Sequence, residues 1–454
     1  MENIPDMIST AARLPVIVWT ITLALFFGTV ALAEEGHGQQ AILKIDLPMA
    51  IQMALDQNSD FAIARLKKAG AEKIKNEATG NALPDLELFG TYRYEGNVQQ
   101  YEIAPGQKLQ FQPDNNYLYG ASFDQWIFSG SVFAGLRGVK HLVAAAEHNV
   151  LAARNSMLAN VKINFYNVHY TKDLIRANEE SVTQLTKHLE DSKARKEVGL
   201  GTDYDTMRFE TQLANVIPRL IQAKNNHDRA IVSLLESLGL NPLQKVEIQG
   251  GLVFKPMSIK LEKAIENAME IRAELAAARE NILLTKEYTN AAKGDLWPTL
   301  KAFGAYTHAN SNLTETGDFT WRREWNVGLK LEMNLFDGWE RSSRVDQRKV
   351  DEEIAAIEKN KAVRSVLVEV KTSYDELLRA RELVESQIKS ISYAEESYRI
   401  IKERRKEGMA TQLELLDAQV ALTGAKINHS RSLFEYSLAK IRLERSMGMV
   451  NAGE

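Results

Sequence analysis

The sequence contains no cysteine, and this absence excludes disulfide bonds, cysteine-ligated metals, thiol catalysis and a lipid-modified N-terminal cysteine. It also carries little net charge. The 56 basic residues nearly balance 60 acidic ones, and a formal charge of −4 argues against a nucleic-acid-binding surface. With 44% hydrophobic and 26% charged residues, the 454-residue chain matches neither a disordered protein nor a helical membrane protein of many spans.

The N-terminal segment holds a long uncharged hydrophobic run, residues 14–30, which ends at Ala31-Leu32-Ala33 before the acidic Glu34. A hydrophobic core followed by small residues in an A-x-A pattern predicts a secretory signal peptide over residues 1–33. The alternative is a transmembrane anchor, but 17 residues lie at the lower limit for crossing a bilayer. The cleavage-like site and the acidic residues after it favour the signal peptide.

The remaining sequence repeats itself once. Short segments recur in the same order at offsets of 214, then 208 and then 209 residues, as loop insertions within two copies of one unit would produce. We therefore predict a first repeat at 34–240, a linker rich in glycine and proline at 241–258, and a second repeat at 259–454. The matched pairs are Ala50-Ile51 with Ala264-Ile265, Leu83-Pro84 with Trp297-Pro298, Phe89-Gly90 with Phe303-Gly304, Ile127-Phe128 with Leu335-Phe336, Val198-Gly199 with Glu407-Gly408, and Leu238-Gly239 with Met447-Gly448.

Two long stretches, residues 139–198 and 339–407, contain neither glycine nor proline and are rich in strong helix formers. Apolar residues recur in both at spacings of three and four, which predicts helices packed along their length on other helices. At 1.5 Å per residue, each helix would be roughly 90–100 Å long, a length typical of coiled coils. The apolar stripes include Met157, Val161, Phe165 and Val168 in the first stretch and Val366, Val370, Leu377 and Val384 in the second.

The segments that precede the long helices change to a two-residue period. Trp325, Val327 and Leu329 alternate with polar residues, and two other segments alternate similarly. The fourth segment, residues 117–128, is rich in aromatic residues but alternates less cleanly. This pattern, with aromatic ends, is typical of transmembrane barrel strands, although a soluble hairpin covering a core is the alternative. The predicted strands are about 85–94 and 117–128 in the first repeat and about 299–308 and 323–336 in the second, joined by polar loops at 95–116 and 309–322.

Four strands are too few to close a transmembrane barrel, for which about eight is the smallest workable number. An open sheet edge in lipid would leave backbone groups without hydrogen bonds, so several copies of the chain must share one barrel. A dimer would supply eight strands and a trimer twelve, and we expect only the larger number to leave an open lumen.

The ordered set of a helix, a strand pair, a long helix and a return helix, present twice from about Leu43 to Met449, resembles the TolC-like outer-membrane efflux protein family. The resemblance implies a mainly α fold with a small β part, in which a homotrimer forms a periplasmic α-barrel and a twelve-stranded β-barrel in outer-membrane lipid. It also implies a passive channel that works with a periplasmic adaptor protein and an inner-membrane efflux pump or ABC exporter, including those of type I secretion. Two departures are Asn58-Ser59, where the family often has Asn-Pro, and Pro218, which we expect to interrupt one return helix.

The two helix-to-helix turns are expected at residues 198–203 and 407–411, where glycine ends each long helix and threonine caps the next. The need to end one helix and begin the next explains the glycines, but it does not explain the apolar Leu200 and Met409 within the turns. By resemblance, these turns are the tips that contact the adaptor. The tip residues are Gly199, Leu200, Gly201 and Thr202 in the first turn and Gly408, Met409, Ala410 and Thr411 in the second.

Glu414 and Asp417 follow the second turn at a spacing that places both carboxylates on one helix face, away from Leu415 and Leu416. A solvated helix face would explain such a pair. The resemblance instead implies an inward-facing acidic pair, so that a trimer would gather six carboxylates at a cation-favouring constriction.

The resemblance also implies contacts between neighbouring helices that hold the tip shut. Asp205 matches the acidic partner, but the usual basic partner falls on Ala410 and a usual tyrosine falls on Arg405. Arg405 is therefore the candidate replacement for the missing base, one helical turn away.

No glycine-rich phosphate loop, His-Glu-x-x-His or Gly-x-Ser-x-Gly sequence is present, and the eight histidines are scattered. We therefore expect no enzymatic activity, cofactor or metal. The main competing function is an exported coiled-coil structural or adhesive protein, which would not explain the paired amphipathic strands. A general diffusion porin would not explain the helices. The exported cargo cannot be read from the sequence.

Overall fold

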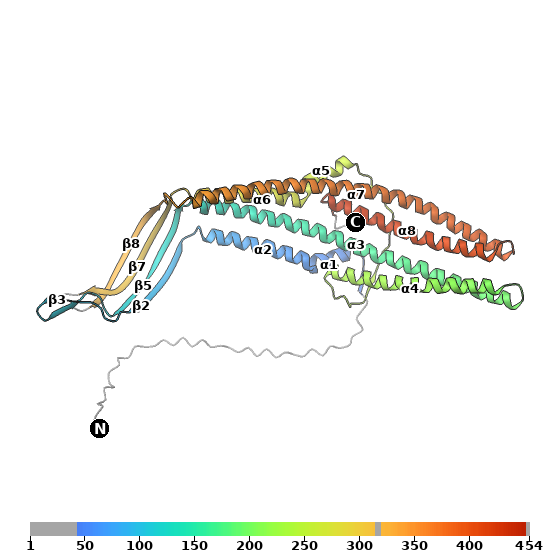
Figure 1. The fold of residues 1–454 in the computed structure, drawn as a ribbon, viewed down its shortest axis with the longest axis horizontal. Helices are drawn as coiled ribbons and strands as arrows, with labels where there is room; N and C mark the ends of the chain where they lie inside the picture. Colours follow the sequence, from blue (N-terminus) through green and yellow to red (C-terminus); the bar gives the residue numbers. More distant parts are fainter. Residues whose placement is uncertain (1–42, 314–318, 451–454) are drawn as a thin grey trace, which may run out of the picture. The chain divides into compact units, whose positions relative to one another are not determined.

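The computed structural model describes residues 43–313 and 319–450. The expected signal peptide at 1–33 lies outside these residues. The described chain is mainly helical with a small β part, which confirms the predicted fold class at that level. Figure 1 shows the main sheet at one end of the long helices and both helix-to-helix turns at the other.

Two helices dominate the fold, α3 (Gly130–Glu197) and α7 (Glu340–Lys406), and each is followed by a return helix, α4 (Asp203–Leu238) or α8 (Gln412–Ser446). Their 68 and 67 residues correspond to roughly 100 Å at 1.5 Å per residue, so the predicted long helices are confirmed. The first begins nine residues before the stretch free of glycine and proline, because Ser129 caps it by accepting a hydrogen bond from the Val132 amide.

The shorter helices come in pairs that precede each strand pair. They are α1 (Leu47–Gln57) and α2 (Ser59–Gly80) in the first half, and α5 (Leu261–Ile271) and α6 (Ala273–Gly294) in the second. Helices α2 and α6 pack on α3, and α6 also packs on α7 (Figure 1). Within residues 43–313 and 319–450, no helix has an apolar stretch long enough to cross a membrane.

The breaks between these paired helices are tied to the return helices by equivalent hydrogen bonds. Asn58 lies between α1 and α2 and donates from its side-chain amide to the Ser237 carbonyl over 2.9 Å. Arg272 lies between α5 and α6 and donates to the Ser446 carbonyl over 3.0 Å. The two donors are 214 residues apart and the two acceptors 209 apart, which are the offsets of the sequence repeat.

The buried cores of the two halves correspond in the same way. One cluster lies around α1, α3 and α4, and the other around α5, α7 and α8. Side chains 209 residues apart are buried in both clusters, so the duplication in sequence extends to the packing. The equivalent pairs are Met157 with Val366, Val161 with Val370, Val168 with Leu377, Leu234 with Leu443, and Leu238 with Met447.

Pro218 does not interrupt its helix, contrary to our expectation, because α4 continues through it. Proline removes one hydrogen bond to the carbonyl four residues earlier, here Ala214. Both residues are exposed, so water can satisfy that carbonyl.

The main sheet contains β2 (Asp85–Tyr94), β5 (Asn115–Phe128), β7 (Thr299–Leu313) and β8 (Phe319–Glu332) in the order β2-β5-β7-β8, with every neighbouring pair antiparallel. Several strand ends differ from expectation, since β5 begins at 115 rather than 117, β7 extends five residues beyond 308, and β8 spans 319–332 rather than 323–336. Strand β8 ends at Glu332 because this residue pairs with Thr299, the first residue of β7, and Pro298 before it has no amide hydrogen to continue the ladder.

Two further strand pairs were not predicted. Strands β3 (Gln100–Ala104) and β4 (Gln107–Gln110) form a hairpin inside the expected polar loop 95–116, turning at Gly106 with φ +82°. The rings of Tyr101 and Phe111 lie 5.4 Å apart beside it. Strands β1 (Leu43–Ile45) and β6 (Val246–Ile248) pair in parallel, which ties the expected linker to the start of α1.

Candidate functional site

One face of the main sheet is apolar and exposed. The register places Leu88, Ala121, Tyr306 and Trp325 in one row across the four strands, and side chains in one row share a face. Leu88 is 86% exposed and Trp325 is 74% exposed. The next row on the same face contains Leu86, Phe123, Gly304 and Val327, so the alternation seen in four separate segments produces a single apolar surface.

The opposite face of the sheet is polar. Asp124 on β5 and Lys301 on β7 form an ion pair of 3.0 Å on it, and Glu87 and Asn326 belong to the same face by register. The outer strands β2 and β8 each have one neighbour in the sheet, so one side of each has no strand to pair with in the described chain. Such edges recruit other strands.

Aromatic residues gather at the end of the sheet away from the long helices. The rings of Tyr92 and Tyr117 lie 5.0 Å apart, and those of Tyr119 and Trp321 lie 5.6 Å apart. Tyrosine and tryptophan have a polar group on an apolar ring, and they are enriched where membrane strands meet the lipid–water interface.

The two helix-to-helix turns have the backbone that the sequence predicted. Gly199 and Gly408 adopt left-handed conformations with φ of +74° and +75°, which ends each long helix. Thr202 and Thr411 cap the return helices by accepting hydrogen bonds from the amides three residues later. Between the glycines and the caps, Leu200 is 76% exposed and Met409 is 62% exposed, whereas Ala410, which we predicted to be a tip residue, is buried.

Glu414 has a local role that the sequence prediction missed. Its Oε2 accepts hydrogen bonds from the Thr411 amide (2.6 Å) and hydroxyl (2.9 Å), which completes a capping box. These two bonds hold the pKa of Glu414 below its usual value. The Thr-x-x-Glu spacing at a helix start would have identified this role.

Asp417 lies one turn further along α8 and is exposed, whereas Leu415 and Leu416 are buried. The two carboxylates therefore do point away from the packed side of α8, as the spacing predicted.

The two candidate gate residues contact their own turns. Arg405 donates hydrogen bonds to the Ala410 carbonyl (3.2 Å) and the Gln412 side chain (2.6 Å). Asp205 accepts a hydrogen bond from the Thr202 hydroxyl over 2.8 Å. In the part of the chain that the structure describes, no ion pair joins Arg405 to Asp205.

Long helical hairpins that carry a small antiparallel sheet are the fold of solved outer-membrane channels. The CmeC outer membrane channel of Campylobacter jejuni superposes with a TM-score of 0.76 at 18% identity, over 90% of this chain and 87% of that one. The family model described as outer membrane efflux protein matches residues 50–240 and 264–449. The chain therefore belongs to the outer membrane efflux protein family.

Individual relatives are distant but similar over most of their length. The outer membrane protein TolC of Escherichia coli (strain K12) is 22% identical over 416 residues, which is 88% of this chain and 82% of the relative. The alkaline protease secretion protein AprF of Pseudomonas aeruginosa is 20% identical over 410 residues, which is 88% of this chain and 84% of the relative.

Proposed function

We propose that this protein is the outer-membrane channel of a tripartite export system. Cargo would enter from an inner-membrane pump or ABC exporter through a periplasmic adaptor and leave passively to the exterior. The observation that carries the proposal is the exposed apolar face on a four-stranded sheet with two unpaired edges, in a member of the outer membrane efflux protein family.

The sheet argues for an oligomer. Lipid offers no hydrogen bonds to the free edges of β2 and β8, so each must pair with another copy. Three copies would supply twelve strands, enough for a barrel with an open lumen, whereas two would supply eight and leave an interior filled by side chains. We therefore propose a homotrimer whose sheets close one barrel in the outer membrane and whose helices form a tunnel in the periplasm.

We assign the tips to adaptor contact. The exposed apolar side chains of Leu200 and Met409 offer a surface for a partner protein. The turn between two helices does not by itself require apolar residues there. Glu414 and Asp417 are proposed as the cation-favouring constriction. Asp205 and Arg405 are proposed gate contacts, made between neighbouring hairpins of the assembled trimer rather than within one chain.

The barrel proposal can be tested on two adjacent residues of β8 that point to opposite faces. V327R places a charge on the apolar face, where lipid contact would cost about 2–4 kcal/mol at the bilayer midplane. N326R places the same charge on the polar face. We expect V327R to lose the heat-sensitive trimer extracted from outer membranes, while N326R keeps it.

Equal behaviour of the two variants would contradict the assignment of the apolar face to lipid. A wild-type chain that purifies as a detergent-free soluble monomer would contradict the whole proposal and favour an exported coiled-coil structural protein. Conductance of the purified trimer in planar bilayers is the positive result that we expect.

A further inference from the structure

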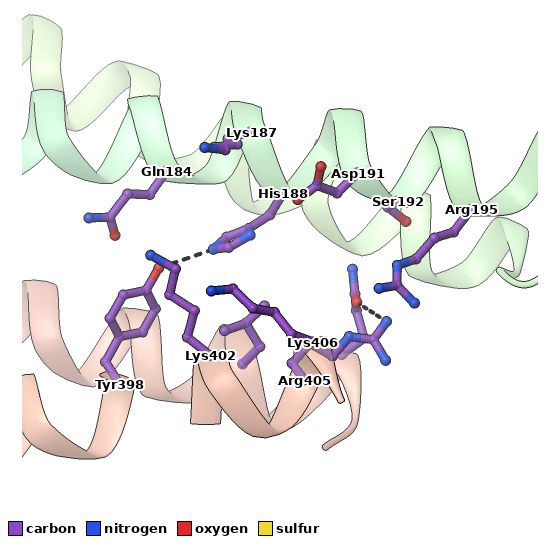
Figure 2. Close-up of a pocket in the computed structure, with 12 residues that line it drawn as sticks. Gln184, Lys187, His188, Asp191, Ser192, Arg195, Tyr398, Lys402, Arg405 and Lys406 are labelled. Atoms are coloured by element: carbon purple, nitrogen blue, oxygen red, sulfur yellow. Dashed lines mark hydrogen bonds between the residues drawn. The ribbon is translucent and has the colours of Figure 1, made fainter. Parts of the chain in front are cut away.

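A pocket of about 320 Å³ lies between α3 and the adjoining ends of α7 and α8, close to the tips. Figure 2 shows Arg405, Lys402 and Lys406 on one helix across from Arg195 and His188 on the other. The charged residues that line the pocket are Lys187, Asp191 and Arg195 from α3 and Lys402, Arg405 and Lys406 from α7.

The charges of this pocket do not balance. Five cations line it against one carboxylate, that of Asp191. Lys406 is paired with Glu403 over 2.9 Å, but no ion pair within the described ranges involves any of the other four cations. Like charges held together by two packed helices repel one another, and an anion placed between them would relieve that repulsion.

Two uncharged side chains of the pocket, His188 and Tyr398, hold each other in place. His188 Nε2 lies 3.2 Å from the Tyr398 hydroxyl, which joins α3 to α7. Burial lowers the pKa of His188, an effect opposed by Asp191 and reinforced by Lys402 and Lys187, so the imidazole adds no further positive charge near neutral pH.

Several donors are positioned for a ligand that carries oxygen atoms. Arg405 is held at the pocket by its bonds to Ala410 and Gln412, while the lysine ammonium groups can turn toward an anion. Gln184 also lines the pocket, and its buried Oε1 has no hydrogen-bond partner among residues 43–313 and 319–450, so its amide can rotate to donate instead.

We propose that this pocket is a binding site for an oxyanion group with at least two negative charges, such as a phosphate or paired carboxylates. The ligand would connect the α3/α4 hairpin to the α7/α8 hairpin next to the tips. Two sources share this chemistry, a free phosphate-type anion and the acidic side chains of a partner protein. The proposal does not depend on the assigned roles of the tip residues.

The test uses the full-length oligomer in detergent and two probes, inorganic pyrophosphate and a hexaglutamate peptide. Binding is measured by calorimetric titration and by the rise in unfolding temperature that a ligand of the folded state produces. K187Q/K402Q removes two cations from opposite walls of the pocket. Because hydrogen bonds to charged groups are strong, we expect this variant to bind at least about tenfold more weakly than the wild type to whichever probe the wild type binds.

The matched control is K172Q/K389Q, which removes one exposed lysine from each of the same two helices outside the pocket. It should bind like the wild type, and circular dichroism should show all three proteins equally helical. The single variant K402Q replaces the double variant if the double variant fails to assemble.

If the wild type binds pyrophosphate and K187Q/K402Q does not, the ligand is a free anion. If the wild type binds only the peptide, the ligand is a set of carboxylates from a partner protein. No binding of either probe, or equal weakening by both double variants, would overturn the proposal.

Discussion

At the scale of single residues, Arg272 shows how the second repeat departs from the first while keeping its function in the fold. Its counterpart Asn58 makes one bond to the return helix and also caps α2. Arg272 keeps the bond to the return helix and adds ion pairs with Glu274 (3.0 Å) and Glu369 (2.9 Å). The side chain of Arg272 is only 9% exposed, so it makes these contacts inside the packed helices and not at the surface.

Arg272→Ala should therefore destabilise the helical part by about 1–3 kcal/mol, because it leaves the buried Ser446 carbonyl without its donor, while Glu369 keeps its ion pair with Arg445. The control is Arg279→Ala on α6, where the side chain is exposed and the loss should stay below about 1 kcal/mol. Thermal unfolding followed by circular dichroism measures both. Equal unfolding temperatures for the two variants would contradict a structural role for Arg272.

Glu369 makes the stability of this region dependent on pH. Burial raises its pKa, but the hydrogen bond from Arg445 and the charge of Arg272 outweigh burial, so the folded-state pKa lies below the usual value. Its stabilising effect is then full above the unfolded-state pKa of about 4.3 and is lost as pH falls through the lower folded-state value. The difference in unfolding temperature between wild type and Glu369→Gln should shrink between pH 7 and pH 3. A difference that grows on acidification would show that the sign is wrong.

At the scale of elements, the ends of α6 and α3 meet through two glycines. A Cβ on Gly294 would lie 2.3 Å from the Gly130 carbonyl carbon, and one on Gly130 would lie 2.6 Å from the Gly294 Cα. Backbone therefore packs on backbone where the helices continue into the sheet. No side chain can be added there unless the two elements separate.

Gly294→Ala should destabilise this junction by about 1–3 kcal/mol, as overpacking does. Gly70→Ala on α2 is the matched control, because a Cβ there meets nothing within 4 Å. Alanine is favoured over glycine inside a helix by roughly 0.8–1.0 kcal/mol, so the control should raise stability. The same chemical change is thus expected to shift the unfolding temperature in opposite directions, and shifts of the same sign would refute the close-packed junction.

Several elements could be predicted because their patterns are long. The absence of glycine and proline over some sixty residues identified α3 and α7, and alternation identified the strands of the main sheet. Strands β1 and β6, with three residues each, are too short to show a period. The cationic pocket could not be predicted at all, because Lys187 and Lys402 come together only when helices more than two hundred residues apart in sequence pack side by side.

At the scale of the whole molecule, the proposed trimer would bring six carboxylates from Glu414 and Asp417 together. Glu414→Gln is suited to test their charge, because glutamine at this position can still complete a capping box. Glu414→Gln/Asp417→Asn should lower the preference for cations in single-channel recordings by roughly twofold or more, since the field of the ring falls with its charge. Unchanged selectivity would refute the assignment of Glu414 and Asp417 to a constriction. The bounds of the two repeats and the contacts of the tips with an adaptor also stay predictions, and they need other experiments.

The free edges of the sheet have a consequence for mixtures of intact and damaged chains. Strands β2 and β8 differ in sequence, so the proposed ring joins unlike surfaces head to tail. A copy with one faulty edge could still dock through its sound edge and then block the next addition. Such a copy would act as a dominant inhibitor, withdrawing functional neighbours into assemblies that never close.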